Sequence, residues 1–465
     1  MKKVLLALAV VSASFSACVK VNIDDSLTNN GGTGGNTDCN DGTKEEQIIC
    51  SKIITGQINE SVTLPKGKYT LKGYVYVTNR AVLTFAAGSV VVSDTVSKGA
   101  LIIERNSRLY AEGTAAEPIV FTSGKKPGQR NPGDWGGIIL LGNAPTNHAT
   151  TPTIEGGVNA QYGGSLAADN SGSLKYVRIE FAGIAADPGS EINGLTLGGV
   201  GSGTTLENIQ VSFANDDAYE FFGGTVNAKN IVAFATADDD FDFDNGFSGR
   251  IQFAVSCRKP DFVDPGDAGN GIECDNNAGG TTATPRTRPQ LSNLTIIGPN
   301  STSAAANHNF SNRWRRATQF VLRNSILMGH PKAGFSIESD ASGQDYVSGT
   351  SEFKNNLVQA TVNPYFIPLS SGNPTVNPSI LTAAQMKTKA ESEGCITYTT
   401  AEEIQLESPF FSTNPNFLPK SGSPALTGSD FTGMTGFTAV AYRGAFGTTN
   451  WTAGWTNWDP QNAVY

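Results

Sequence analysis

The chain has 465 residues, including 52 glycines and 22 prolines, and its formal net charge at pH 7 is −9. A turn-rich composition with few charges is typical of β-structure, and the acidic balance argues against a general nucleic-acid-binding role. The three histidines show no ligand spacing, so a histidine zinc site or a Ser-His-Asp triad is disfavoured.

Residues 1–17 have the features of a signal peptide. Two lysines precede an apolar run, 4–11, that is too short to span a bilayer. The sequence Phe-Ser-Ala-Cys that follows resembles a bacterial lipobox, which implies that Cys18 is lipidated and becomes the first mature residue. Phe15 stands where leucine is usual, and plain secretory cleavage near Ala17 is the alternative.

Residues 18–45 are polar and glycine-rich, which predicts a flexible tether between the lipid anchor and a folded body. Asp24 and Asp25 lie close behind Cys18, a placement that resembles the acidic surface-export signals of Bacteroidota lipoproteins. These features predict a lipid-anchored outer-membrane protein at the cell surface.

The other cysteines fit export to an oxidising compartment. Their sequence proximity predicts two disulfides that close short loops, Cys39 with Cys50 and Cys257 with Cys274. A loop of the second size stabilises the fold by roughly 3 kcal/mol in the chain-entropy model. Cys395 is left over and is predicted to be a free thiol in the core.

Short apolar or alternating segments separated by glycine turns begin at about residue 54, as strands would, for example at 68–77, 81–85, 89–93 and 100–104. A helical pattern occurs at 381–393, where Thr382 is a plausible N-terminal cap.

An asparagine recurs just before an apolar segment, with spacings that fall mostly between 22 and 32 residues; the copies are Asn208, Asn230, Asn293, Asn324 and Asn355, and Tyr176 marks a sixth. A repeat of this length made of strands and turns predicts an all-β, right-handed parallel β-helix, which we place at 46–430. An asparagine at each turn can bond to neighbouring coils and tolerates left-handed backbone angles. Ordinary loop asparagines are the alternative.

The C-terminal residues 431–465 are predicted to be a capping segment. They contain Trp451, Trp455 and Trp458, and the end of a solenoid exposes an apolar cross-section that must be covered. Stacking of these tryptophans on sugar rings is the alternative.

Two acidic blocks align when the chain is shifted by 23 residues, which pairs Asp216 with Asp239 and Asp217 with Asp240. On adjacent coils such carboxylates would lie about 4.8 Å apart and repel by roughly 3 kcal/mol per pair at an effective dielectric of 20. Because hard oxygen ligands suit Ca²⁺, we predict a calcium site formed by these four and Asp242. A solvated stack balanced by arginines and a set of catalytic carboxylates are the alternatives.

Five basic residues offer a counterpart to the acids: Arg258, Lys259, Arg313, Arg315 and Arg316. Turns of successive coils line one long groove, so these side chains could grip an anionic or hydroxyl-rich chain there. Structural pairing with the acidic ladder is an equally weighted alternative.

Four segments together resemble exported right-handed β-helix proteins of Bacteroidota, over roughly residues 60–465: 118–123, 127–145, 216–224 and 451–460. The resemblance implies the fold and the export, and it identifies no catalytic residue.

Two functions follow as hypotheses. The first is a non-catalytic surface lipoprotein whose groove binds a glycan, a peptide or a partner protein, as an accessory to a TonB-dependent transporter. The second is a calcium-dependent polysaccharide lyase, with Lys259 or an arginine as the base, or a glycoside hydrolase that uses two aspartates. No Gly-His-Gly element accompanies the acids, so the sequence favours binding.

Overall fold

The computed structural model describes residues 39–187, 190–301 and 303–465, and Cys39–Tyr465 form one compact unit. The predicted signal peptide, Cys18 and most of the predicted tether lie outside the described residues. Among the described residues, no helix has the length and apolar character needed to cross a membrane.

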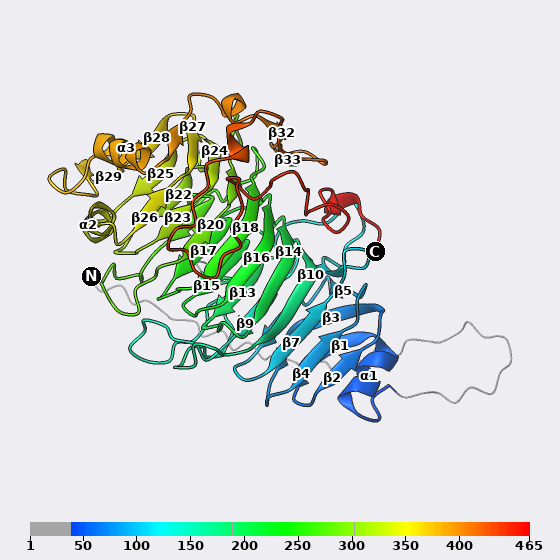
Figure 1. Cartoon of the computed structure of the whole chain (residues 1–465). Helices are drawn as coiled ribbons and strands as arrows, with labels where there is room; N and C mark the ends of the chain where they lie inside the picture. The colour runs from blue at the N-terminus through cyan, green and yellow to red at the C-terminus, as the bar shows by residue number, and fades with distance from the viewer. Residues whose placement is uncertain (1–38, 188–189, 302) are drawn as a thin grey trace, which may run out of the picture. The chain divides into compact units, whose positions relative to one another are not determined.

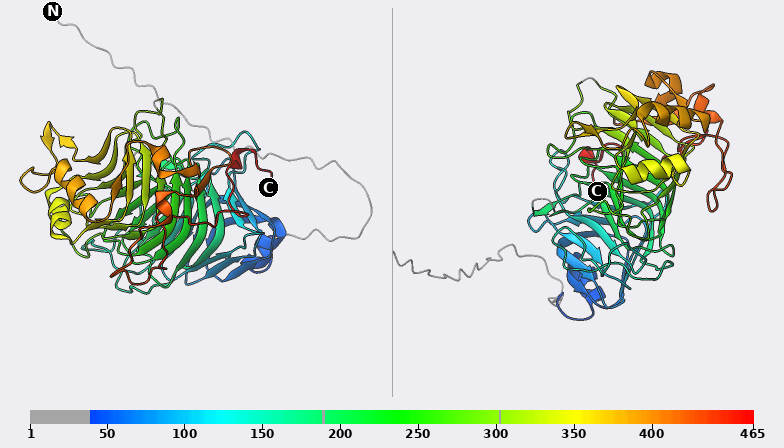
Figure 2. Two further views of the ribbon diagram at one scale, coloured as in Figure 1. Left: turned by 45° about the horizontal axis from the view of Figure 1, so that its top comes forward. Right: turned by 90° about the vertical axis from the view of Figure 1, so that its left-hand side faces the viewer.

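The described chain is a parallel β-helix, which confirms the predicted fold class (Figures 1 and 2). One sheet of 27 strands winds around the core, and its pairings are parallel. The coils present three stacked rows of strands, here called faces 1, 2 and 3, and the chain visits them in the order 3, 1, 2.

The strands of each face stack directly on one another. Face 1 contains β5 (Val90–Ser93), β8 (Ile119–Thr122), β21 (Thr295–Ile297), β24 (Ile326–His330), β27 (Leu357–Ala360) and β31 (Ile396–Thr397). Face 2 contains β6 (Ala100–Ile103), β9 (Gly137–Leu141), β13 (Leu195–Gly198), β15 (Tyr219–Phe222), β17 (Phe241–Asp244), β19 (Ile272–Cys274), β22 (Phe310–Trp314), β25 (Ala333–Ile337) and β28 (Asn363–Phe366). Face 3 contains β2 (Val62–Leu64), β4 (Val82–Phe85), β7 (Arg108–Glu112), β20 (Gln290–Ser292), β23 (Val321–Arg323) and β26 (Glu352–Lys354).

Longer strands turn a corner between faces. Four of them pass from face 3 to face 1: β10 (Gly172–Glu180), β14 (Thr205–Ser212), β16 (Asn227–Phe234) and β18 (Arg250–Cys257). Two pass from face 1 to face 2: β1 (Ile53–Ile58) and β3 (Lys68–Val77). Small antiparallel pairs lie outside the main sheet: β11 (Ala185–Asp187) with β12 (Ser190–Glu191), β29 (Leu369–Ser370) with β30 (Asn373–Pro374), and β32 (Leu406–Ser408) with β33 (Asn416–Pro419).

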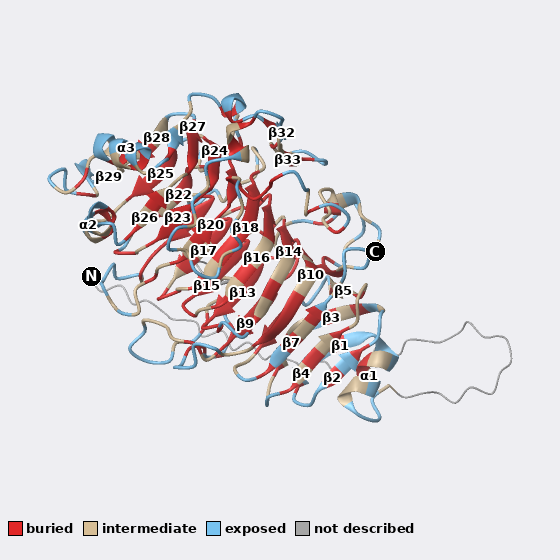
Figure 3. Cartoon of the chain, in the orientation of Figure 1, coloured by how far each residue is buried: buried red, intermediate tan, exposed pale blue. Residues whose placement is uncertain are grey.

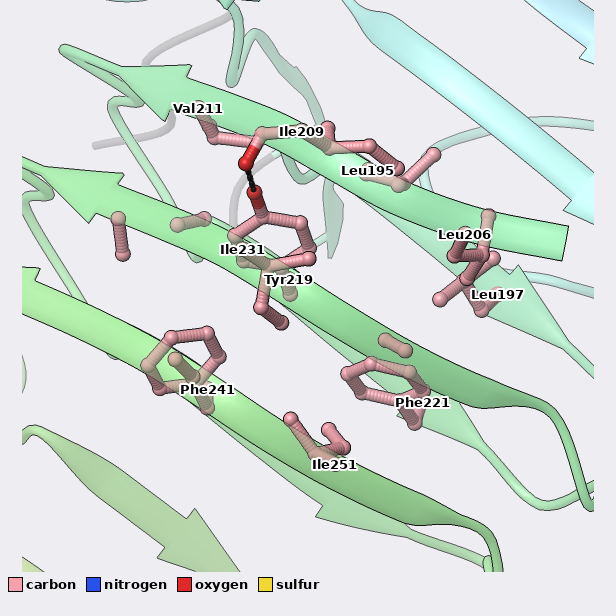
Figure 4. Close-up of a cluster of buried hydrophobic side chains, with 14 of the residues drawn as sticks. Leu195, Leu197, Leu206, Ile209, Val211, Tyr219, Phe221, Ile231, Phe241 and Ile251 are labelled. Carbon is pink, nitrogen blue, oxygen red and sulfur yellow. Dashed lines mark hydrogen bonds between the residues drawn. The ribbon is translucent and has the colours of Figure 1, made fainter. Parts of the chain in front are cut away.

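The interior is filled by side chains that repeat from coil to coil. Tyr219 stacks on Phe241 with ring centroids 5.4 Å apart, and Phe221 stacks on Phe243 at 5.1 Å. The hydroxyl of Tyr219 donates to the carbonyl of Ile209 at 2.9 Å, which satisfies its buried polar group (Figure 4). Buried residues run continuously along the central strands (Figure 3), so the coils stabilise one another by stacking.

The asparagine repeat marks the corner between faces 3 and 1. All five asparagines have left-handed backbone angles, with φ between 54° and 58°. Phe253 occupies the same corner with φ of 61° in the long gap of the repeat, because β18 pairs with β16 there. The left-handed conformation is as predicted. The side-chain amides, however, also bond to the C-terminal segment, as Asn293 Nδ2 does to the Tyr442 carbonyl at 2.9 Å.

Helices cover both ends of the coil stack. Helix α1 (Lys44–Ser51) begins with a capping box at Thr43 and buries Ile48 against the first coil. Near the other end lie α2 (Asp340–Ser348) and α3 (Ala383–Ser392). Helix α3 confirms the predicted helix, and Thr382 forms its capping box.

The C-terminal segment, residues 424–465, lies along the corner of the solenoid and not over its end. Its backbone meets Asn324, then Gln252, then Gln210, and the hydroxyl of Tyr465 donates to Glu180 at 2.6 Å. The segment therefore runs back along the stack. Trp455 is buried in the apolar cluster between this segment and face 1.

The disulfide between Cys39 and Cys50 is present, with the two Cα atoms 5.5 Å apart. The predicted disulfide between Cys257 and Cys274 is wrong, since both cysteines are free. Cys257 packs outside face 1 against the C-terminal part of the chain, whereas Cys274 points into the solenoid core. Cys395 is a buried free thiol, as predicted.

Asn324 offers a test of the corner. Its side chain donates to Ser292 and to the Asp430 carbonyl, and accepts from the Asp430 N–H at 2.8 Å. Asn324→Gly keeps the left-handed backbone but strands these buried partners, so calorimetric unfolding should show a loss of about 2–3 kcal/mol. Asn324→Ala should cost about 1 kcal/mol more, from backbone strain. Asn208→Gly, at a corner without such side-chain bonds, is the matched control. Unchanged stability of Asn324→Gly would contradict the assignment.

Candidate metal centre

The acidic residues lie on face 2 and in the turns that lead into it. Strand β15 pairs with β17 so that Glu220 lies beside Asp242, a shift of 22 residues. The predicted shift of 23 is therefore wrong by one residue. Asp217 stacks on Asp239 and not on Asp240, and in a strand a slip of one residue moves a side chain to the opposite face.

Asp217 and Asp239 belong to a ladder of side chains that join successive coils. Asp217 Oδ1 accepts the Asp239 N–H at 2.7 Å, and Asp239 Oδ1 accepts the Asn270 N–H at 2.6 Å. Asn270 Oδ1 continues the pattern by accepting the Phe310 N–H at 3.1 Å. One oxygen of each aspartate thus serves the backbone of the next coil, and the other oxygen remains for a different partner.

A second acidic row stands on the outer side of face 2, and arginines neutralise only its far half. Arg313 binds Glu273 at 2.9 Å and Glu338 at 2.7 Å. Arg315 and Arg316 bind Asp275 at 2.9 and 2.8 Å. The structural alternative for these three arginines is thereby supported, because their guanidinium groups are engaged by carboxylates of the same face.

The near half of the row has no such cations. In the described part of the chain, two groups of carboxylates can each bring one oxygen per residue within 4.8 Å of the others: Asp216, Asp217 and Asp238, and Asp217, Glu220 and Asp242. We call these five residues the acidic cluster. Asp238 Oδ1 and Asp242 Oδ1 are buried and lack hydrogen-bond partners within the described chain. Clustered carboxylate oxygens are the ligand set that Ca²⁺ prefers.

Asn193 and Glu155 complete the surroundings of the acidic cluster. The Asn193 amide donates to Glu220 Oε2 at 2.5 Å and to Glu155 Oε1 at 3.1 Å. Glu155 comes from the loop that follows β9, and burial raises its pKa. A carboxyl group from a distant part of the sequence thus joins those of face 2.

Burial raises the pKa of every member of the acidic cluster well above the ordinary carboxyl range, and the neighbouring carboxylates raise it further. The same two causes raise the pKa of Asp244 to about 7. Burial also raises the pKa of Glu273 to about 8, although Arg313 and Arg315 oppose that shift. Without a compensating cation the cluster therefore retains protons at neutral pH, and a bound divalent cation would displace them.

The structure brings together only part of the predicted calcium site. Asp216, Asp217 and Asp242 lie in the acidic cluster, and Asp239 stacks beside it. Asp240 does not belong to it, because its carboxylate faces the buried Arg258 guanidinium at 3.2 Å. Burial raises the Asp240 pKa to about 6.

Sequence reasoning missed Asp238, Glu220 and Glu155. A shift of 22 residues, which the spacing of Asn208 and Asn230 already contains, would have placed Glu220 beside Asp242. Glu155 has no comparable signal, because its loop carries no repeat.

Two predicted binding residues have different positions. Arg258 is fully buried, bonds to Asp240 and to the Asn270 carbonyl at 2.7 Å, and cannot reach an external ligand, so that prediction is wrong. Lys259 is partly exposed and forms an ion pair with the exposed Asp261. An exposed pair of this kind contributes little stability, which leaves the Lys259 ammonium group able to meet a ligand.

Comparison with known proteins places these features in a family. A family model described as "Pectate-lyase like beta helix domain" matches residues 56–404. No curated protein matches the sequence. A solved structure, "Crystal structure of pectate lyase Pel9A", is similar at 14% sequence identity and a TM-score of 0.32, over 84% of this chain and 88% of that chain.

The raised pKa values predict an unusual pH dependence. Because these carboxyl groups hold protons more tightly in the folded state, the metal-free protein should lose stability as pH rises from about 4, the unfolded pKa, to about 8, the folded pKa of Glu273. In EDTA, the calorimetric Tm should fall by roughly 5 °C or more between pH 5 and pH 8. Millimolar Ca²⁺ should reverse most of the fall, and Asp217→Asn should reduce it. A Tm in EDTA that rises over this range would contradict the argument.

Proposed function

We propose that this chain, which belongs to the pectate-lyase-like β-helix domain family, is a lipid-anchored surface protein that binds Ca²⁺ at the acidic cluster and, through it, an acidic polysaccharide. The observation that carries the proposal is the uneven neutralisation of face 2. Arginines compensate Glu273 and Asp275, but within the described chain no ion pair compensates Glu220 or Asp242.

The cluster suits a calcium ion that also contacts an external ligand. Asp216, Asp238 and Asp242 are only partly buried, so the site has an open side. Ca²⁺ takes six to eight oxygen ligands, and the carboxylates present leave positions for oxygens from a ligand. The carboxylate of a uronic acid residue is a hard anionic oxygen donor, so it can complete the ligand set while the protein's own acidic groups are screened by the ion.

The place of the protein is proposed from its N-terminus. The lipobox-like sequence ending at Cys18 and the glycine-rich residues 18–45 support anchoring in an outer membrane of the Bacteroidota type, with the β-helix held at the cell surface. A polysaccharide bound there could be passed to a transporter of the TonB-dependent class, which we propose as the partner.

A polysaccharide lyase is the second candidate, because of the family match and because Lys259 lies within a groove beside the acidic turns. A bound Ca²⁺ would supply acidity at the proton next to the uronate carboxylate, and the Lys259 amine would have to accept that proton. The three arginines named from the sequence are committed to Glu273, Asp275 and Glu338, which favours binding over cleavage.

Calcium binding can be measured by isothermal titration. The wild-type protein should bind Ca²⁺ with a heat that disappears in Asp217→Asn, because Asp217 belongs to both groups of the acidic cluster. Asp261→Asn, an exposed acid outside the cluster, should bind like the wild type. Absence of binding at millimolar Ca²⁺, or equal loss in both variants, would refute the proposed site.

Cleavage can be tested separately with polygalacturonate and alginate. We expect binding that requires Ca²⁺ and no growth of the ultraviolet absorbance of unsaturated uronate products. Product formation that is lost in Lys259→Ala but retained in Lys420→Ala, an exposed lysine elsewhere, would replace the binding function with the lyase.

A further inference from the structure

A groove of about 460 Å³ lies where the C-terminal part of the chain crosses the turns between faces 1 and 2. This volume is in the range of small-ligand sites. Its walls carry five aromatic rings, which define it as the aromatic groove: Phe181, Phe213, Phe262, Phe411 and Trp458.

The rings are held in place by packing beneath them. Phe181 and Phe213, from successive coils, stack with centroids 5.4 Å apart and planes 16° from parallel. Phe411 and Trp458 both pack on the buried Phe234, each with its centroid 5.0 Å away. Four of the five rings nevertheless remain partly exposed, because only Phe181 is fully buried. The groove therefore presents fixed aromatic surface to a ligand at little entropic cost.

Polar groups line the edge of the groove. The amides of Asn131 and Asn462 are exposed, and the Lys259 ammonium group lies 5.8 Å from the centroid of the Phe411 ring. Flat apolar surface with hydrogen-bonding groups at its rim complements a pyranose ring, which has apolar C–H faces and hydroxyl groups around its edge. A cation at the rim adds complementarity to a uronate carboxylate.

The aromatic groove and the acidic cluster share the same two turns. Phe213 precedes Asp216 by three residues in the turn from β14 to β15. In the next coil, the loop that carries Phe262 is fixed by the Asp264 N–H, which donates at 2.9 Å to the carbonyl of Ala237, the residue before Asp238. A linear ligand held at the cluster can therefore extend into the groove.

We propose that the aromatic groove binds pyranose rings of the same acidic polysaccharide chain whose carboxylates are held at the acidic cluster. This inference rests on the proposed function for its ligand class. The groove itself is formed by residues 458–462 and 411–413, outside the stretch that matches the family, so it is a feature that the family match does not supply.

Tryptophan fluorescence of the full chain can test the proposal with oligogalacturonate hexamers in the presence of Ca²⁺. The hexamer should quench the emission, and Trp458→Phe should remove most of that response while retaining binding. Phe262→Ala should weaken binding by about tenfold or more with Ca²⁺ affinity unchanged. Phe410→Ala is the matched control, since Phe410 is partly buried but lines a different cavity.

The outcomes separate the two proposals. Ca²⁺-dependent hexamer binding that is the same in wild type, Phe262→Ala and Phe410→Ala would overturn the aromatic groove and leave the acidic cluster standing. Hexamer binding that depends on Phe262 in a protein that binds no Ca²⁺ would support the groove and refute the proposed function. No emission change in the wild type, or a response to aromatic peptides but not to saccharides, would overturn the groove.

Discussion

The coil-to-coil register is the constraint on which the rest of the structure depends. A parallel β-helix places equivalent residues of neighbouring coils at the spacing of hydrogen-bonded strands, so any residue type that repeats becomes a continuous row. Inside the solenoid this produces the aromatic stacks of Tyr219 on Phe241 and Phe221 on Phe243. Outside, the same geometry stacks Glu220, Asp242 and Glu273. Apolar rows are stabilised by this arrangement, whereas a row of like charges needs cations or protons.

Face 2 meets that need in two ways along its length. At the far end, the row changes from acidic to basic, since Glu273 pairs in register with Arg313. At the near end, the carboxylates are stacked against an asparagine, Asn193, which can bond to two of them but cannot neutralise them. The difference between the two ends gives the acidic cluster a meaning that a count of acidic residues would not, because the same fold shows both a compensated and an uncompensated stretch.

The fold could be predicted from the sequence because its signals are periodic. The asparagines at the corner, such as Asn208 and Asn230, recur with the coil and adopt the left-handed angles expected of them. The site could be predicted only in part. Aligning the acidic blocks by their best visual match gave a shift of 23, whereas the asparagines, fixed by backbone geometry, carry the true shift of 22. Glu155 and the C-terminal segment were beyond prediction, because their positions depend on tertiary contacts that leave no repeat in the sequence.

The C-terminal segment shows how a solenoid acquires a site that its coils alone do not contain. Each coil offers a similar corner, so a repeated surface has little to distinguish one coil from the next. By running back along the stack, the segment bonds to corners as far apart as Asn324 and Gln210 and places Trp458 beside the turn of Phe213. It thereby creates aromatic surface at the coils that also carry the uncompensated carboxylates. A polar cation site and an apolar ring-binding surface in one place suit a ligand that is both charged and ring-shaped, and this coincidence ties the aromatic groove to the acidic cluster.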